Sequence, residues 1–410
     1  MENSLRLAAS ALKRGEAPEA REMLESITVG MGGLVDFIRQ KYFEDYISKG
    51  GSKIKFITGK AGSGKTHLAR LLRYAAEDLG FTAVGFSARD VWLHDFKEVY
   101  AEIFKKSDLT AKLTKCAAKI AAELGYDLDD VPAGITFADY LSSIGELDAL
   151  TKKEIRNQLR EMFLKNPLID NNFAIACGLL TGSILGHPVL ESANAESLLS
   201  WLAGEKDVKL AALRSLGLSP AKITKYNARH MLRSLAEVCR LASCPGIIVM
   251  IDNAEALVSS TSLDVIRYTK LKREDTYESI RELIDEIDTL RNVMFFYLFD
   301  RELIDNELSG IKSYQALWMR IQNEIASPRF NAFTDIIDLD RYAAETFTAE
   351  TVREMSERVA EAVNAQTGGA QSIGIAAAEK ILTEARFAKV SALRQIVLAT
   401  VLGEEWETAL

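Results

Sequence analysis

Short apolar runs along the chain alternate with longer stretches in which apolar residues recur at helical spacing. The short runs are rich in β-branched and aromatic residues and predict five buried strands, at residues 53–57, 81–88, 247–251, 291–300 and 334–339. After the first run, apolar residues follow helical spacing from Leu68 to Leu79, and Gly80 ends the pattern. Short strands separated by helices predict an α/β fold with a five-stranded parallel sheet covered on both faces.

About 160 residues separate the second and third strand runs, far more than a connection within a compact domain requires. Helical signals recur in this stretch, and Thr151 and Glu154 have the spacing of a capping box. We therefore expect residues 108–218 to form a large, all-helical insertion.

Two further helical segments flank the last strand runs. Ser219 followed by Pro220 predicts a helix start, with proline at the first helical position. Residues 219–243 are therefore expected to form one core helix that leads into the third strand. Residues 341–410 are again helical in pattern and are expected to form a small C-terminal lid.

Composition and charge place the chain among globular proteins. Its 410 residues are 48% hydrophobic and 26% charged, enough for a core and a second domain or large insertion. The net charge of −8 argues against tight nonspecific DNA binding by the whole surface. A local basic loop could still contact DNA phosphates, although an ordinary solvated loop is the preferred interpretation; its residues are Arg267, Lys270, Lys272 and Arg273.

Cysteine spacing and the apolar stretches indicate a cytoplasmic protein with no membrane segment. None of the four cysteines forms a C-x-x-C pair, so we expect buried thiols in a reducing compartment. The N-terminus lacks an apolar signal core. Residues 172–186 are too short to span a bilayer and predict a buried helix.

A glycine-rich stretch joins the first strand run to the helical pattern after it. Gly59, four further residues, and then Gly64, Lys65 and Thr66 form the phosphate-loop pattern. Its glycines let backbone N–H groups face phosphates, Lys65 would neutralise the β- and γ-phosphates, and the Thr66 hydroxyl would ligate Mg²⁺. The alternative is a decayed pocket that no longer binds nucleotide. The predicted cofactor-binding residues of this stretch are Gly59, Lys60, Ala61, Gly62, Ser63, Gly64, Lys65, Thr66 and His67.

An acidic residue on a neighbouring strand should complete the metal site. Asp252 ends the buried run Ile247–Ile251, and this segment resembles the Walker B element, in which the aspartate holds the Mg²⁺ shell. The alternative is an acidic cap on a core strand. Hydrolysis also needs a carboxylate to orient and deprotonate water. Related proteins usually carry glutamate directly after the aspartate, but Asn253 stands there, so either Glu255 is the base or hydrolysis is slow.

The combination of these blocks resembles the P-loop ATPases of bacterial phage-defence islands, including the ATP-binding D component of bacteriophage exclusion (BREX) systems. These belong broadly to the AAA+ and STAND-like ATPases. The resemblance covers nearly the whole length, from ALKRGEAPEA and ITVGM through KIKFITGKAGSGKTHLARLL to SWLAGE, MLRSLAEVCRLASCPGIIVMIDNAEAL and ALWMRI. It implies that Thr28, Val29 and Gly30 lie near the adenine.

The resemblance implies three further roles. Asp300, at the end of the fourth strand run, would be a sensor of the γ-phosphate; a solvated strand end is the alternative. Arg320 would be an arginine finger that reaches a neighbouring subunit, and a surface arginine on an amphipathic helix is the alternative. Arg394 would be the sensor arginine of the lid.

We therefore expect an AAA+-like P-loop ATPase that binds ATP and Mg²⁺, self-associates, and works with a helicase, nuclease or methyltransferase in phage defence. A nucleotide-gated scaffold with little hydrolysis and a small-molecule kinase are the rivals. The expected divisions are an N-terminal helical lead-in, two halves of the ATPase core around the insertion, and the lid, at residues 1–45, 46–107, 108–218, 219–340 and 341–410.

Overall fold

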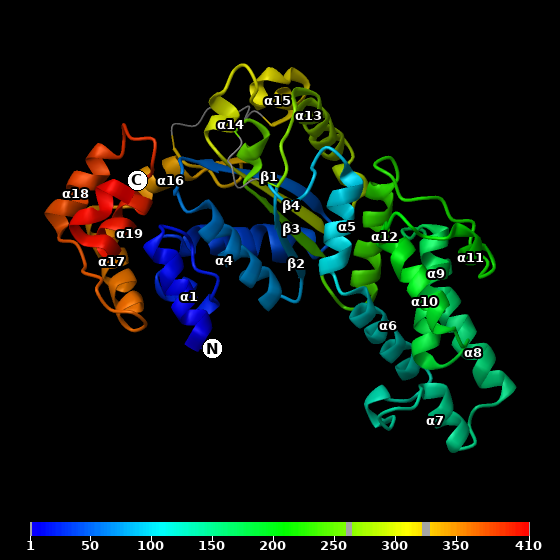
Figure 1. Ribbon diagram of the computed structural model, residues 1–410. Coiled ribbons are helices and arrows are strands. Elements are labelled where there is room, and N and C mark those ends of the chain that lie inside the picture. Colours follow the sequence, from blue (N-terminus) through cyan, green and yellow to red (C-terminus); the bar gives the residue numbers. More distant parts are fainter. Residues whose placement is uncertain (1, 260–264, 322–328, 410) are drawn as a thin grey trace.

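A five-stranded, all-parallel sheet forms the centre of the computed structural model, which describes residues 2–259, 265–321 and 329–409 (Figure 1). Its strands lie in the order β2-β3-β4-β1-β5. Their bounds are Ser52–Gly59 for β1, Thr82–Ser87 for β2, Ile247–Asp252 for β3, Val293–Asp300 for β4 and Ile336–Asp338 for β5. The predicted α/β class and five parallel strands are confirmed.

Strand register brings the acidic strand ends to one edge of the sheet. Gly59 pairs with Asp300 across β1 and β4, and Ser87 pairs with Asp252 across β2 and β3. After β1, the chain forms α4 (Lys65–Asp78) on one face of the sheet. After β4, it leads to α15 (Gln315–Ile321) on the other face of the sheet. Diverging connections open a crevice beyond the carboxyl ends of parallel strands, where ligands bind in such folds.

The strands are apolar throughout because both faces of the sheet are buried. Along β3, Ile247, Val249 and Ile251 face one core, whereas Ile248 and Met250 face the other. The first core packs against α5 (Phe96–Lys106), α12 (Ala228–Leu241) and α13 (Lys270–Asp285). The second core packs against α4 and the N- and C-terminal helices.

Helix α4 ends where the sequence predicts. Gly80 adopts φ +82°, a left-handed conformation that glycine tolerates, and the Phe81 N–H bonds the Ala76 carbonyl at 3.0 Å. The chain then enters β2 directly. β1, the glycine-rich loop, α4 and β2 therefore follow one another along the chain without a long connection.

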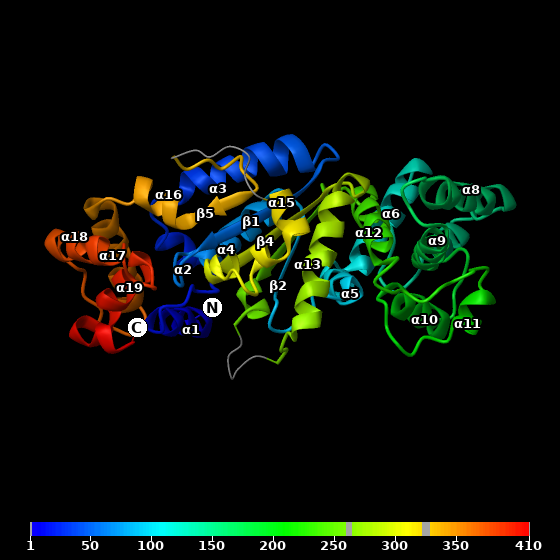
Figure 2. The ribbon, with the colours of Figure 1, turned by 90° about the horizontal axis from the view of Figure 1, so that it is seen from above.

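Residues 108–218 form helices and loops that project from one end of the sheet (Figures 1 and 2). The apolar run at residues 172–186 is the buried helix α9, as expected, and none of the described helices is long and apolar enough to cross a bilayer. The helices are α6 (Leu109–Glu123), α7 (Phe137–Ser143), α8 (Ala149–Leu159) with its π-helical continuation (Arg160–Leu164), α9 (Asn171–Leu185), α10 (Ser192–Leu202) and α11 (Leu210–Arg214).

Two predicted helix starts are wrong. Asp148, rather than Thr151, caps α8, because its carboxylate accepts the Thr151 N–H at 2.7 Å. Ser219 and Pro220 lie in a loop, and the helix predicted to begin there begins at Ala228 as α12.

Tertiary contacts explain the late start of α12. The Asn172 side chain accepts the Ser219 N–H at 2.8 Å, and the Trp201 indole donates to the Ala221 carbonyl at 2.9 Å. Backbone groups that would have begun the helix are thereby satisfied by the insertion. The Asn227 side chain then accepts the Thr224 N–H at 2.7 Å and forms the turn before α12.

The two ends of the chain pack together beside the second core (Figure 2). Helix α1 contacts α17 and α19. The N-terminal helices are α1 (Glu2–Lys13), α2 (Arg21–Ser26) and α3 (Gly32–Ile38), which continues as the π-helical segment Arg39–Ile47. After α14 (Glu302–Asp305) and β5, the C-terminal helices are α16 (Leu339–Thr346), α17 (Ala349–Asn364), α18 (Ile375–Glu384) and α19 (Ala392–Leu402).

Candidate functional site

The glycine-rich loop leaves β1 and enters α4 through two left-handed glycines. Gly62 has φ +75° and Gly64 has φ +89°. A Cβ atom at Gly62 would lie 2.4 Å from Cβ of Arg394, and one at Gly64 would lie 2.6 Å from Cε of Met31. The loop is therefore held between the N-terminal segment and α19, at distances that only glycine permits.

Lys65, the first residue of α4, is buried against this loop. Its ammonium lies 2.5 Å from Asp300 Oδ1 and donates to the carbonyls of Lys60 at 2.9 Å and Gly59 at 3.2 Å. The lysine thus bridges the ends of β1 and β4. A flexible ammonium in this position can turn from loop carbonyls to an anion in the crevice.

Thr66 and Asp252 join the loop to the end of β3. The Thr66 hydroxyl donates to Asp252 Oδ2 at 2.7 Å, and Asp252 Oδ1 accepts the Asn253 N–H at 2.8 Å. Among the described residues, no group of three His, Cys, Asp or Glu side chains could hold a metal ion alone. A hydroxyl and a carboxylate fit Mg²⁺, which typically takes few protein oxygens together with water and substrate phosphates.

Glu255 lies in a 3₁₀ turn (Ala254–Leu257) directly after β3. Its Oε2 accepts the Asp300 N–H at 3.2 Å, and its Oε1 lies 3.1 Å from a guanidinium nitrogen of Arg89. Burial, with smaller contributions from Asp300 and Asp252, raises the pKa of the Glu255 carboxyl above its ordinary value. Glu255 is therefore placed at the same edge as Lys65 and Thr66.

Asn253 makes the turn that places Glu255. Its φ of +58° lies in the left-handed region, which asparagine tolerates better than glutamate does. The backbone reverses there, so the residue two positions later returns toward the β4 end. This conformation gives a physical reason for asparagine rather than glutamate at this position.

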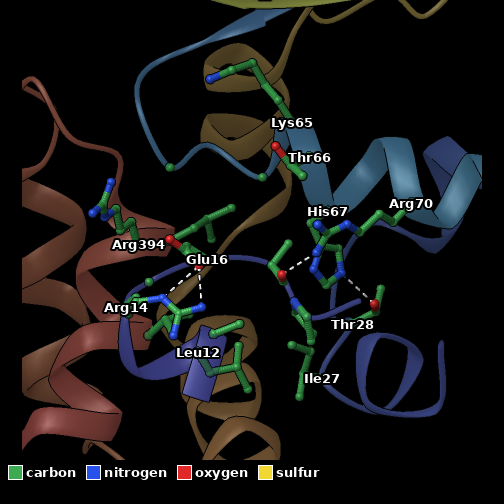
Figure 3. Close-up of a pocket in the computed structure, with 18 of the residues that line it drawn as sticks. Leu12, Arg14, Glu16, Ile27, Thr28, Lys65, Thr66, His67, Arg70 and Arg394 are labelled. Carbon is green, nitrogen blue, oxygen red and sulfur yellow. Dashed lines mark hydrogen bonds and ion pairs between the residues drawn. The ribbon is translucent and has the colours of Figure 1, made fainter. Parts of the chain in front are cut away.

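A cavity of about 780 Å³ opens from the glycine-rich loop (Figure 3). Its volume is within the roughly 300–1,000 Å³ typical of small-molecule sites. Lys65, Thr66, His67, Asp252, Asn253, Glu255 and Asp300 line it, together with Ala61, Gly62 and Gly64. Its apolar wall comes from both ends of the chain and includes Leu12, Ile27, Val29, Phe347, Met355, Val359, Leu393 and Val397.

Segment 28–30 borders the cavity only in part. Thr28 and Val29 line it, whereas the Gly30 carbonyl accepts the Tyr342 hydroxyl at 2.6 Å and supports the wall from behind. His67 Nε2 lies 2.8 Å from Thr28 Oγ1. Burial, together with the nearby Arg70 charge, lowers the pKa of His67 to about 4.

Arg394 reaches the cavity from the first turn of α19. Its side chain packs over Gly62 and Gly15, and its Nε is buried with no hydrogen-bond partner among the described residues. Ser391, the N-cap of the same helix, donates through its hydroxyl to the Gly62 carbonyl at 2.5 Å. The C-terminal helices therefore contact the glycine-rich loop directly.

Five residues predicted for the site do not line the cavity: Gly30, described above, and Gly59, Lys60, Ser63 and Arg320. Gly59 lies behind the loop against Ser63, and the Ser63 hydroxyl is buried beside Lys65. The Lys60 ammonium turns away and donates to the carbonyls of Ala385 at 2.9 Å and Arg386 at 3.0 Å. Arg320 lies outside the cavity lining, on α15.

Arg320 forms an ion pair within its own chain. Its Nε lies 2.5 Å from Asp285 Oδ1 on α13, and about a third of each side chain is exposed. The prediction of a basic loop is wrong for three of its four residues, because Lys270, Lys272 and Arg273 form the first turn of α13 after the N-cap Thr269. Lys272 lies over the Trp92 ring with its ammonium 3.4 Å from the centroid, and Arg267 and Lys270 are exposed. None of these basic residues lines the cavity.

Sequence reasoning missed Arg89, Ser391 and Asp340. Arg89 follows the second strand directly, so its place at the carboxyl edge was available from the strand pattern. Ser391 and Asp340, whose carboxylate accepts the Lys60 N–H at 3.0 Å, carry no local signal for a contact with a loop more than 270 residues away.

Comparison with known proteins assigns the chain to a family. The model of the family described as "BREX system ATP-binding protein BrxC/D" matches residues 5–397. No curated protein and no solved structure matches the chain. The suspected resemblance is confirmed, since the match covers nearly the whole sequence. The chain belongs to the family of BREX system ATP-binding proteins BrxC/D.

Proposed function

We propose that the protein is an AAA+-like P-loop ATPase that binds ATP with Mg²⁺ in the cavity and hydrolyses it. One observation carries the proposal: Lys65, Thr66, Asp252, Glu255 and Asp300 come from three strand ends and meet at one cavity. This set combines a phosphate-binding cation, two oxygen ligands for a hard metal and a buried carboxylate.

The phosphates would lie on the glycine-rich loop. N–H groups between Ala61 and Thr66 and the N-terminus of α4 would face them, and Lys65 would exchange its contact with Asp300 for the β- and γ-phosphates. Thr66 and Asp252 would hold Mg²⁺, which when bound neutralises charge on the phosphate oxygens. Val29 and the apolar wall would contain the adenine, with Gly30 supporting them.

Glu255 would act as the general base and Asp300 as the sensor that orients the reacting group. Asn253 could orient the attacking water but cannot accept its proton. The test is Glu255→Gln, which we expect to bind ATP normally and to turn over at least about tenfold more slowly. Equal turnover by the variant and the parent protein would refute the role of Glu255.

A nucleotide-gated scaffold with little hydrolysis is the second candidate. Asn253 favours it, because the residue directly after Asp252 is a neutral amide that cannot accept a proton from water. Release of phosphate from ATP, measured with and without DNA, separates the two. Turnover in either condition supports the ATPase, and nucleotide binding with no release in both supports the scaffold.

The proposed divisions are the lead-in at residues 1–45, core halves at 46–107 and 219–340, the insertion at 108–218 and the lid at 341–410. Lys60, Ser391 and Arg394 link the loop to the lid, so a bound γ-phosphate would change the position of the lid or the assembly of the protein. Size measurement with and without a slowly hydrolysed ATP analogue tests this. An unchanged monomer would remove the arginine-finger role of Arg320.

Within a BREX system, we place the protein in the cytoplasm, where a helicase, nuclease or methyltransferase would be its partner. Family membership supports the defence setting, and the partner class rests on the resemblance. DNA contact by Arg267 and by Lys270, Lys272 and Arg273 at the start of α13 is a further part of the proposal. A pull-down from cells that carry the whole defence system, with ATP present, tests the partner class.

A further inference from the structure

One face of α4 holds the segment that joins α1 to α2. Arg70, Tyr74 and Asp78 lie four residues apart along α4, so their side chains share one face of the helix. Each of the three contacts a different residue of segment 17–21, which leads from the turn after α1 into the first residue of α2. The segment is therefore attached to the same helix that begins at the glycine-rich loop.

The contacts fall on every second residue of the segment. The Arg70 guanidinium donates to the Ala17 carbonyl. The Tyr74 hydroxyl donates to the Glu19 carbonyl at 2.7 Å. Eight residues of helix rise about 12 Å, and four residues of extended chain span about 13 Å. The spacing of the helix positions therefore matches a segment that runs nearly straight along the helix.

Asp78 and Arg21 complete the row with two parallel hydrogen bonds. The terminal nitrogens of Arg21 lie 2.7 and 2.6 Å from the two carboxylate oxygens of Asp78, and the guanidinium lies over the Tyr74 ring, 5.1 Å from its centroid. Both charged side chains are about half exposed, but a bidentate pair within a row of contacts holds its geometry better than a single ion pair does. Because Arg21 is the first residue of α2, this pair fixes where α2 begins.

The segment held in this way forms the cavity wall away from the phosphate end. Residues 17–19 line the cavity, and so does Ile27, the C-cap of α2. In Figure 3, Lys65 and Thr66 lie at one end of the close-up and Ile27 lies at the other. The first turn of α4 thus faces one end of the cavity, while its later turns hold the wall at the other end. A base would lie toward this wall if the phosphates occupy the loop, so the inference rests on the proposed function.

We propose that Arg21, Tyr74 and Asp78 are positioning residues for the base of the nucleotide. None of these three side chains lines the cavity, and they act through residues 17–19 and the start of α2. Without their contacts the glycine-rich loop would still hold the phosphates, since it precedes them along α4. The base would then bind only those molecules in which the wall is in place, which lowers the apparent affinity for the whole nucleotide.

The test compares ATP with tripolyphosphate, which has the phosphates but no base, in competition against a fluorescent ATP analogue with Mg²⁺ present. Asp78→Arg sets two guanidinium groups against each other in place of the ion pair. We expect this variant to bind ATP about threefold to thirtyfold more weakly, and to bind tripolyphosphate as the parent protein does. Adding Arg21→Asp restores an ion pair with the charges exchanged, and should restore the ATP affinity.

Glu77→Arg is the matched control for Asp78→Arg. It makes the same change of charge at the neighbouring residue, which pairs with Arg73 within α4, and should leave both affinities unchanged. Tyr74→Phe is a milder second variant, in case Asp78→Arg does not fold. It removes the hydroxyl that reaches Glu19 but keeps the ring, and should weaken ATP binding severalfold while tripolyphosphate binds as before.

A parent protein that binds neither ligand would overturn the proposed function itself. Three results would overturn only this inference: a parent that binds ATP no more tightly than tripolyphosphate, an equal loss of both ligands in Asp78→Arg, and ATP affinity that Arg21→Asp does not restore. If tripolyphosphate fails to compete with the analogue even at millimolar concentration, the loss of ATP affinity and its restoration in the double variant decide.

Discussion

The Thr66 hydroxyl donates a 2.7 Å hydrogen bond to Asp252 Oδ2 across a sequence separation of 186 residues. Lys65, the residue before Thr66, lies 2.5 Å from Asp300. Adjacent residues of one loop thus contact the ends of two different strands, β3 and β4. The strand ends already hold the polar side chains of the site together. A bound nucleotide would therefore replace existing contacts between these side chains, and would not need to bring the side chains together.

Replacing Lys65 should weaken nucleotide binding, whereas replacing another lysine of the same loop should not. We expect Lys65→Ala to bind ATP about tenfold to a hundredfold more weakly, because charge-assisted bonds to phosphate are lost. Lys60→Ala is the matched control: that ammonium donates to carbonyls of the C-terminal helices and should leave ATP affinity unchanged. Calorimetric titration with ATP measures the affinity of both variants. An equal loss of ATP affinity in the two would contradict the finding that the Lys65 side chain faces the cavity and the Lys60 side chain faces away from it.

Turnover should depend on the ionisation of Glu255. Its pKa is raised above the ordinary value of 4.5, first by burial and then by Asp300. A general base works when it is deprotonated, so turnover should fall as the pH falls through this raised pKa. The acid limb of the rate profile should therefore have its inflection above pH 4.5.

Asp300→Asn gives the control for this pH dependence. Removing a negative charge near Glu255 should move the inflection to lower pH, whatever happens to the maximal rate. Phosphate release measured across the acid range shows both effects. An inflection that does not move would mean that another group titrates.

Arg320 offers a test of catalysis between subunits. As an arginine finger it should lower turnover by about a thousandfold or more when replaced by alanine, at unchanged ATP affinity. Arg281→Ala is the control, because Arg281 also contacts Asp285 but has no proposed role in turnover. Both variants lose ion pairs that are at least partly exposed and worth roughly 0–1 kcal/mol, so the free energy of unfolding should change little. Equal turnover in both variants and the parent would leave Arg320 as a surface arginine.

Lys55 should make the stability of the sheet depend on pH. It is fully buried on β1, its ammonium donates to the carbonyls of Ala332, Phe333 and Thr334, and burial, partly offset by Asp335, lowers its pKa from 10.5 to about 7. Between these two values the unfolded chain binds the proton that the folded protein releases. Stability should therefore rise with pH in that window, by up to about 1.4 kcal/mol per pH unit.

Lys55→Met removes this titration and serves as the reference. Urea unfolding of the parent and the variant at pH 7.5 and pH 9.5 isolates Lys55, because every other group titrates in both. The parent should gain stability relative to the variant as the pH rises. A constant difference would mean that the three carbonyls keep the ammonium charged throughout.

The sequence alone determined the α/β class, the five strands and the loop between β1 and α4. These features are local: apolar runs mark buried strands, and the glycines needed for left-handed turns are visible in the chain. The ends of parallel strands share one edge of a sheet, so Asp252 and Asp300 could be expected near Lys65 without coordinates. The start of α12 could not, because Asn172 on α9 and Trp201 on α10 satisfy the backbone near Ser219 through tertiary contacts.

Only the tertiary structure decided where side chains of the site point. Lys60 and Lys65 belong to one loop, yet contacts with the C-terminal helices turn Lys60 away while Asp300 holds Lys65 at the cavity. The contact between His67 and Thr28 likewise joins the start of α4 to a segment 39 residues away in the chain. Sequence patterns report burial and local caps, whereas these directions depend on which distant groups supply the hydrogen-bond partners.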